Sequence, residues 1–264
     1  MSKSAFTAAG FPRSRVATFD IGVLSRRRHY VTALLELRVG EARRRIKALR
    51  AESGERISFT AWLLTVIAAA VHRHPEAAAF RKGRRHLVIP KDVDISVIVE
   101  KELEGKKVPL PLVIRKVQNK SAVEVTAEID AARRGDAGGD TVVLEHATSR
   151  AESLYYLLPG PMRRLAWRLM FKRPRYLFKR MGNVVVTAVG MMGKVNGWFI
   201  QTSVHPLAFG IGAITRKPVA EGDTVIIDEV LHMTVLLDHD AVDGAPMARF
   251  LADLTASIEA PANL

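Results

Sequence analysis

The sequence contains no cysteine, and this absence excludes several kinds of chemistry. Without thiols the protein can form no disulfide, no thiolate metal site and no covalent intermediate on a cysteine nucleophile. The Gly-x-Ser-x-Gly elbow of serine hydrolases and the Walker phosphate-binding loop are also missing. If the chain transfers a chemical group, direct transfer between two bound substrates is therefore the natural mechanism.

Long apolar runs and targeting signals are missing as well. The longest apolar stretch, residues 62–71, is interrupted by Thr65 and is far shorter than the roughly 20 residues that a membrane span needs. Residues 1–11 contain a single lysine and no long apolar core, so they do not resemble a signal peptide. We expect a cytoplasmic protein that begins with a flexible leader, residues 1–15.

Acidic residues are outnumbered by basic ones: 27 Asp and Glu stand against 40 Lys and Arg, which gives a net charge of +13. A surface this basic favours anionic partners such as nucleic acid, anionic lipid or phosphate-bearing cofactors, without choosing among them. The chain has 264 residues, 48% of them hydrophobic, which is enough for one large domain or two small ones.

A hexapeptide near the C-terminus, His239 to Gly244, carries the most informative pattern. It follows an apolar, strand-like run over residues 230–237 and precedes a helix-like run over residues 245–254. A histidine held at the end of a buried strand can accept a proton near neutral pH, and Asp243 beside the turn can stay near the same site. The pattern equally fits a strand-to-helix turn in which both side chains only make hydrogen bonds.

The same hexapeptide resembles a known signature. His-x-x-x-Asp-Gly after an apolar strand is similar to the motif of chloramphenicol acetyltransferases and of the catalytic domains of dihydrolipoyl acyltransferases, and the longer string from Asp238 to Leu251 is closer to the second. The resemblance covers roughly residues 16–258. It implies an α/β fold, the chloramphenicol acetyltransferase-like two-layer sandwich with a mixed sheet and helices on one face, in a single catalytic domain at residues 16–264.

The three adjacent arginines near the N-terminus would ordinarily form a solvated basic turn. The string from Phe19 to Tyr30, however, resembles the opening of chloramphenicol acetyltransferases. The resemblance implies that Arg26 pairs with Asp243 and fixes the loop that aims His239, a suitable task for a bidentate arginine–carboxylate pair. A shift of one residue would make Arg27 the partner. Residues 17–21 read as a short strand, and the leading helix of dihydrolipoyl acyltransferases is not evident.

Thr187 lies in an apolar strand, residues 183–190, that closes in a glycine turn. Dihydrolipoyl acyltransferases have a hydroxyl residue, usually serine, at this point, and the resemblance implies that Thr187 donates a hydrogen bond to the oxyanion of a tetrahedral intermediate. Without the resemblance, a β-branched residue chosen for strand packing would be the simpler explanation.

The resemblance implies a coenzyme A-dependent acyltransferase in which His239 is the general base. The partners would be acyl-CoA, a thiol or hydroxyl acceptor such as a lipoyl group on a separate protein, and two further copies of the chain in a homotrimer. No lipoylation string or peripheral-subunit-binding domain is apparent in the sequence. The alternative is a non-catalytic trimeric scaffold, or a basic module that binds membranes or nucleic acid; nucleic acid is not expected as a partner of the enzyme.

No metal site is expected. A zinc site from His232, His239 and Asp243 is conceivable, but the two histidines lie seven residues apart on a strand and its end, so they should face opposite sides.

Residues 141–181 diverge most from the family and read as a basic amphipathic insertion. Within them, residues 154–180 combine aromatic, aliphatic and basic side chains. Such a segment can lie on an anionic membrane or line an acyl-chain or partner groove, and it can also be an ordinary packed helix with a basic outer face.

Periodicity and capping signals predict the remaining elements. The predicted helices and strands are helices 41–51 and 59–74, a helix that starts at a Ser121–Glu124 capping box, and strands 30–39, 86–90, 92–99, 108–114, 197–204, 207–215 and 225–237.

Overall fold

The computed structural model describes residues 10–11, 14–83, 85–103, 106–135, 155–190 and 195–262. Its centre is one mixed sheet of six strands in the order β1-β8-β7-β6-β4-β5. Strand β6 runs parallel to both β4 and β7, and the other neighbouring strands are antiparallel. The strands are β1 (Tyr30–Arg38), β4 (Ile95–Leu103), β5 (Lys106–Ile114), β6 (Val184–Ala188), β7 (Leu207–Glu221) and β8 (Thr224–Asp238).

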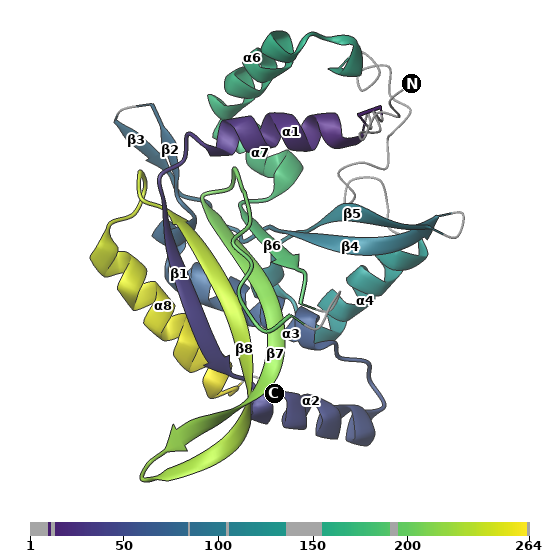
Figure 1. Cartoon of the computed structure of the whole chain (residues 1–264), viewed down its shortest axis with the longest axis vertical. Helices are drawn as coiled ribbons and strands as arrows, with labels where there is room; N and C mark the ends of the chain where they lie inside the picture. Colours follow the sequence, from purple (N-terminus) through teal and green to yellow (C-terminus); the bar gives the residue numbers. More distant parts are fainter. Residues whose placement is uncertain are drawn as a thin grey trace, which may run out of the picture.

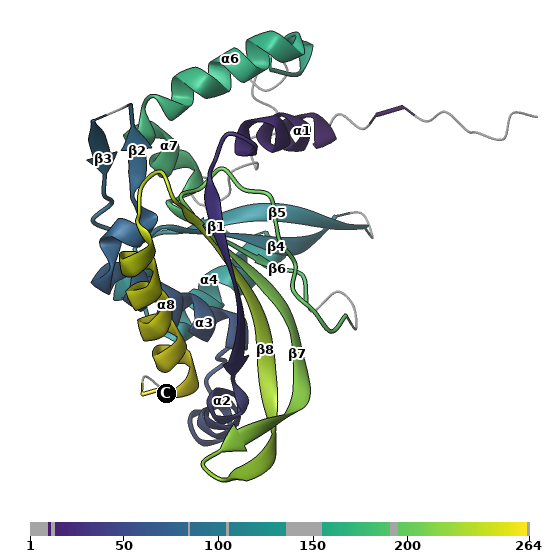
Figure 2. The same cartoon turned by 60° about the vertical axis from the view of Figure 1, so that its left-hand side comes forward.

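Four helices cover one face of this sheet, as Figure 2 shows in side view. They are α2 (Gly40–Ser53), α3 (Phe59–Arg73), α4 (Ala122–Arg134) and α8 (Gly244–Glu259). Helix α3 is apolar almost all round and packs on α4 and α8, so it forms the middle of the core. The predicted mixed sheet with helices on one face is therefore confirmed.

Capping residues begin these helices where the sequence predicts. The Ser58 side chain accepts a hydrogen bond from the backbone N–H of Ala61 at the start of α3. At the start of α4, Ser121 and Glu124 form the predicted reciprocal capping box. Each pair satisfies backbone N–H groups that have no partner within the helix.

A smaller group of elements lies at one end of the sheet. Helix α1 (Ser14–Ser25) packs against α6 (Gly160–Phe171), and α7 (Pro174–Met181) follows α6 (Figure 1). Strands β2 (Phe80–Lys82) and β3 (His86–Val88) form a hairpin beside them. None of the described helices is long and apolar enough to cross a bilayer.

Two predicted strands are wrong. Residues 17–21 belong to helix α1, so the chain does have a leading helix. Asp20 of this helix is fully buried and forms an ion pair with Arg163 of α6. Most of the leader, residues 1–15, lies outside the described residues, and α1 begins at Ser14.

Residues 197–204, predicted as a strand, are not paired in the sheet. Their backbone passes over β7 instead of beside it. A side-chain carbon added to Gly210 would lie 2.6 Å from the carbonyl oxygen of Phe199, and one added to Gly212 would lie 2.7 Å from that of Gly197. Glycines in β7 thus leave room for this crossing, which periodicity alone does not reveal.

Candidate active site

His239 follows the last residue of β8, a strand that is buried over its second half. Its backbone N–H donates to the carbonyl of His29 at 2.8 Å, and the backbone N–H groups of Ala241 and Val242 donate to the carbonyl of Asp238. These bonds fix the turn. The imidazole of His239 is exposed and makes no hydrogen bond to any other described side chain, so it is free to meet a substrate.

The arginine that supports this loop is Arg28, and its partner is Asp238. Nη1 of Arg28 lies 2.5 Å from Oδ2 of Asp238, which is almost fully buried, and Nη2 donates to the carbonyl of Val204. The Arg28 guanidinium also lies 4.4 Å from the centre of the Phe80 ring. This pair joins β8 to the segment before β1 directly next to His239.

The predicted pairing of Arg26, or Arg27, with Asp243 is therefore wrong within the chain. The register of the sheet gives the reason, because Tyr30 pairs with Asp238 and so places Arg28 just beyond the end of β8. Arg26 and Arg27 are exposed on the preceding turn.

Asp243 and Gly244 lie where the helix begins. Asp243 is the N-terminal cap of α8 and Gly244 is its first residue. The carboxylate of Asp243 is exposed and makes no cap hydrogen bond. Asp243 follows His239 by four residues. Among the described residues of the same chain, none forms an ion pair with its carboxylate.

Thr187 lies on β6, in the sheet whose strand β8 leads to His239, but it is far from His239. Thr187 pairs with Gly210 of β7, which pairs with Thr234 of β8, five residues before His239. That offset is about 17 Å along the strand and two strand spacings, about 10 Å, across the sheet. One copy of the chain therefore does not bring the Thr187 hydroxyl to the His239 imidazole.

A second acidic residue beside His239 ties the loop to neighbouring elements. Asp240 contacts Nδ1 of His29 at 3.0 Å and Nη1 of Arg81, from the β2–β3 hairpin, at 3.2 Å. Sequence reasoning missed the roles of Arg28, Asp238 and Asp240. All three lie in the two strings that resemble the family, residues 19–30 and 238–251, but only the strand register shows which of them meet.

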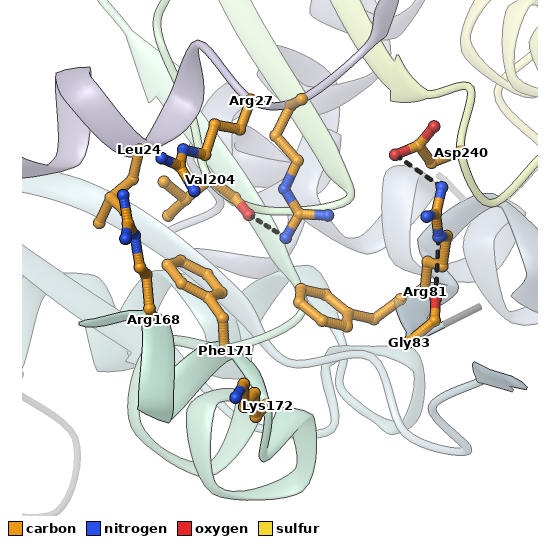
Figure 3. A pocket seen from close by; sticks show the side chains of 11 residues that line it. Leu24, Arg27, Arg81, Gly83, Arg168, Phe171, Lys172, Val204 and Asp240 are labelled. Carbon is orange, nitrogen blue, oxygen red and sulfur yellow. Dashed lines mark hydrogen bonds and ion pairs between the residues drawn. The ribbon is translucent and has the colours of Figure 1, made fainter. Parts of the chain in front are cut away.

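Asp240 also lines a cavity of about 460 Å³ (Figure 3). Its walls come from the end of α1, the β2–β3 hairpin, the end of α6 and Val204. The rings of Phe80 and Phe171 lie parallel there, with their centres 6.2 Å apart. The cations that line the cavity are Arg27, Arg28, Arg81, Arg168 and Lys172.

The charges of this cavity are not balanced. Arg28 and Arg81 pair with Asp238 and Asp240, whereas Arg27, Arg168 and Lys172 form no ion pair with any carboxylate that the structure describes. Three uncompensated cations around two aromatic rings fit a ligand with negative charge and a flat or apolar part.

Two neutral groups lie in the wall beside the cavity. His205 is buried, and burial lowers its pKa to about 4, with a smaller contribution from the Arg28 charge; its Nε2 lies 3.0 Å from the carbonyl of Met181. The Tyr30 hydroxyl donates to the carbonyls of Ser203 and His205, and burial raises its pKa to about 12. Both groups are thus uncharged at neutral pH and hold the 203–205 segment against the strand ends.

His232, the other histidine considered for zinc, is buried near Trp198, and burial, together with the charge of Lys217, lowers its pKa. Its Nε2 lies 2.8 Å from Nζ of Lys217. Within the residues that the structure describes, no three His, Asp or Glu side chains gather to hold a metal ion.

Comparison with known proteins agrees with this arrangement. The family model of the 2-oxoacid dehydrogenases acyltransferase catalytic domain matches residues 24–139 and 180–264, about three quarters of the chain. The chain belongs to this family. The two matched stretches leave out residues 140–179, which contain α6 and most of α7.

Curated relatives are similar in sequence to this family member over parts of their length. The acetyltransferase component of the pyruvate dehydrogenase complex of Rickettsia typhi is 32% identical over 80 residues, 30% of this chain and 20% of the relative. That of Mycoplasma pneumoniae is 25% identical over 205 residues, 77% of this chain and 42% of the relative. The chain thus spans less than half the length of these relatives.

Solved structures show the same fold. A probable dihydrolipoamide acetyltransferase from Listeria monocytogenes superposes with a TM-score of 0.69 at 16% identity, covering 98% of this chain and 96% of that one. The dihydrolipoamide acetyltransferase of Azotobacter vinelandii gives 0.69 at 17% identity, covering 97% and 93%. A chloramphenicol acetyltransferase gives 0.50 at 14% identity, covering 94% and 96%. The predicted chloramphenicol acetyltransferase-like fold is confirmed.

Proposed function

We propose that the protein transfers an acyl group from a coenzyme A thioester to a thiol or hydroxyl acceptor, with His239 as the general base. The observation that carries this proposal is the state of His239: its backbone is fixed between β8, His29 and α8, while its imidazole is open and unpaired among the described residues. A base must be rigidly placed and yet free to contact the proton that it removes.

The reaction is a direct transfer. His239 takes the proton from the acceptor as its sulfur or oxygen attacks the thioester carbonyl, and a tetrahedral intermediate with a negatively charged oxygen forms. The Thr187 hydroxyl donates a hydrogen bond to that oxygen. When the intermediate collapses, the bond to the coenzyme A sulfur breaks, and the imidazolium returns its proton to the leaving thiolate.

Two copies of the chain are needed for one site. Thr187 and His239 lie on the order of 20 Å apart in one chain, by the strand offset and spacing given above. In a cyclic trimer, Thr187 of one protomer would face His239 of the next, which gives one complete site at each of the three interfaces.

The spacing of a characterised relative supports these roles. The Azotobacter vinelandii structure was determined to investigate a serine, a histidine and an asparagine in the catalytic mechanism; there the histidine follows the serine by 52 positions and the asparagine follows the histidine by four. Here His239 follows the hydroxyl residue Thr187 by 52 positions, and Asp243 follows His239 by four. The exposed carboxylate of Asp243 is thus placed to orient the His239 loop, or to bind a side chain of the neighbouring protomer.

The donor side is supported by charge. Acyl-CoA carries phosphate groups, and the cavity beside Asp240 offers three uncompensated cations, Arg27, Arg168 and Lys172. Charge-assisted bonds from Arg and Lys are the usual means of phosphate binding. The acceptor is a thiol or hydroxyl, such as a lipoyl group on a separate protein.

The first test measures thiol release from a panel of acyl-CoA thioesters in the presence of dihydrolipoamide and simple thiol and alcohol acceptors. His239→Ala should abolish acceptor-dependent release, whereas His72→Ala, at an exposed histidine near the end of α3, should leave it unchanged. Equal rates in the wild type and His239→Ala would remove the catalytic assignment and leave a non-catalytic scaffold.

The second test asks whether two protomers share a site. His239→Ala and Thr187→Val, each inactive alone, are mixed, dissociated and reassembled. Random mixing places an intact histidine beside an intact threonine at about one quarter of the interfaces, so about one quarter of the activity should return. If both groups came from the same protomer, mixing would restore nothing.

A further inference from the structure

Helix α6 is attached to the rest of the molecule through polar and aromatic contacts. None of its residues is fully buried, and the ring of Phe171 stacks on that of Phe80. Nε of Arg163, which is 14% exposed, lies 2.7 Å from Oδ2 of the fully buried Asp20 of α1. Tyr155 donates to the same carboxylate, and Nε1 of Trp167 donates to the Tyr155 hydroxyl. The side of α6 that faces α1 is therefore held by polar bonds.

The outer face of α6 is apolar. Met162, Leu165 and Leu169 are 53%, 54% and 53% exposed. Their spacing of three and four residues places them on one stripe of the helix. Leu157, just before the helix, is exposed as well. An outward apolar stripe of this kind marks a surface that meets an apolar partner.

The segment is also strongly basic. Residues 154–181 contain eight Lys and Arg and no Asp or Glu. Arg168 of α6 and Lys172, the residue after its last turn, are exposed and follow the stripe toward the C-terminal end of the helix. Apolar residues bordered by cations, in a segment that contains no acid of its own, are typical of helices that lie in the interface of an anionic bilayer.

We propose that the outer face of α6 docks the protein on the surface of an anionic phospholipid bilayer. Its 12 residues would lie in the plane of the membrane over about 18 Å, by the rise of an α-helix. Figure 1 shows α6 at the outer edge of the molecule, beyond α1 and away from the sheet. The proposal does not depend on acyl transfer.

Docking would place the candidate site near the lipid. Arg168 and Lys172, at the end of α6, line the cavity that Asp240 borders on its other side. Asp240 directly follows His239, so their Cα atoms are about 3.8 Å apart. The C-terminal end of α6 and the loop of the proposed base thus border one cavity.

The test is co-sedimentation of the full chain with vesicles of phosphatidylglycerol and phosphatidylcholine in equal parts, and with vesicles of phosphatidylcholine alone. The wild type should bind the anionic vesicles at least about tenfold more tightly, since each cation near such a surface contributes a factor of about five. High salt should weaken this binding. Equal binding to both kinds of vesicle, or to neither, would overturn the proposal.

A matched pair of double variants locates the contact. Leu165→Glu with Leu169→Glu should lower vesicle affinity by about tenfold or more, because it removes the apolar stripe and adds negative charge. Val225→Glu with Ile227→Glu makes the same change at two residues, 73% and 57% exposed, in the distant β7–β8 hairpin, and should bind as the wild type does once its smaller net charge is allowed for.

Two results would contradict the location. One is vesicle binding that the two double variants weaken equally. The other is a change in the oligomeric mass of the Leu165→Glu, Leu169→Glu variant in analytical ultracentrifugation without vesicles, which would make this face a contact between protein chains. Circular dichroism verifies that both variants fold; a further variant, Leu165→Ser with Leu169→Ser, removes the stripe without adding charge and should also lose affinity.

Discussion

The guanidinium of Arg28 lies 2.5 Å from the carboxylate of Asp238, and the residue after Asp238 is His239. Asp238 is 1% exposed and Arg28 13% exposed, so little water competes for the pair. The pair therefore determines where β8 ends and how the His239 turn leaves the sheet. Removing either partner would leave the other charge buried without compensation, which destabilises the fold.

Loss of Arg28 should be costly in both stability and activity. Arg28→Ala leaves the Asp238 carboxylate buried without its partner and should lower the free energy of unfolding by about 3 kcal/mol. Arg26→Ala, two positions away on the exposed turn, should change it by less than about 0.5 kcal/mol. Urea unfolding of both variants measures the difference. Equal effects would mean that the pair does not support the loop.

Thr187 should be required for its hydroxyl and not for its shape. Thr187→Val keeps the β-branched volume and removes the donor, so kcat should fall by about 10²- to 10³-fold with a small change in KM. Thr187→Ser keeps the donor and should retain most of the activity. Steady-state kinetics with one acyl-CoA and one acceptor decide the matter; a Val variant as active as the Ser variant would assign Thr187 to packing alone.

Arg27 should act on the phosphates of the donor. It lines the cavity, is exposed and forms no ion pair with a described residue. Arg27→Gln should raise the KM for acyl-CoA by about tenfold, the value of one charge-assisted hydrogen bond. The KM for the corresponding acyl-pantetheine, which lacks phosphate, should not change. A similar increase for both donors would show that the cavity does not recognise phosphate.

Buried His205 should make the fold sensitive to mild acid. Because its pKa is lowered to about 4 in the folded protein, the unfolded chain binds a proton between that value and the ordinary pKa of about 6.5 while the folded chain does not. The contribution of His205 to the free energy of unfolding is therefore fully present above pH 6.5 and is lost as the pH falls toward 4. From pH 7.5 to 5 this group should cost about 2 kcal/mol.

Chemical denaturation at the two pH values tests this linkage. In His205→Gln the difference between pH 7.5 and pH 5 should shrink by about 2 kcal/mol, whatever the stability of the variant at neutral pH. His72→Gln, at an exposed position, should leave the difference as in the wild type. A His205→Gln variant with an unchanged pH dependence would mean that His205 is not neutral in the folded protein.

The sequence was sufficient for elements that local patterns determine. The strand before His239, the helix after it and the two capped helices follow from an apolar run, a glycine turn and Ser caps. These signals depend on neighbouring residues only, so a single sequence carries them.

The sequence was insufficient where distant segments decide the structure. Choosing Arg28 over Arg26 depends on the register of β1 against β8, two strands that lie some 200 positions apart in the sequence. A shift of this register by two residues changes no local sequence pattern. Likewise, residues 17–21 alone suggested a strand, whereas in the structure they belong to helix α1, whose buried Asp20 pairs with Arg163 far along the chain. The proposed meeting of Thr187 and His239 would require a second protomer, so no pattern within a single chain could reveal it.

The close approach of Gly190 to Gly212 should control the position of Thr187. A side-chain carbon on Gly190 would lie 1.8 Å from the carbonyl oxygen of Gly212, a backbone atom that cannot move aside alone. Gly190→Ala should therefore push the end of β6 from β7, lower the free energy of unfolding by about 2 to 3 kcal/mol and reduce kcat, because Thr187 lies three residues earlier. Gly197→Ala, where the added carbon meets no atom within 4 Å, is the matched control and should change neither quantity appreciably. If Gly190→Ala lowered stability but left kcat intact, the strand end would not position the hydroxyl, and the assignment of Thr187 to the oxyanion would lose its structural basis.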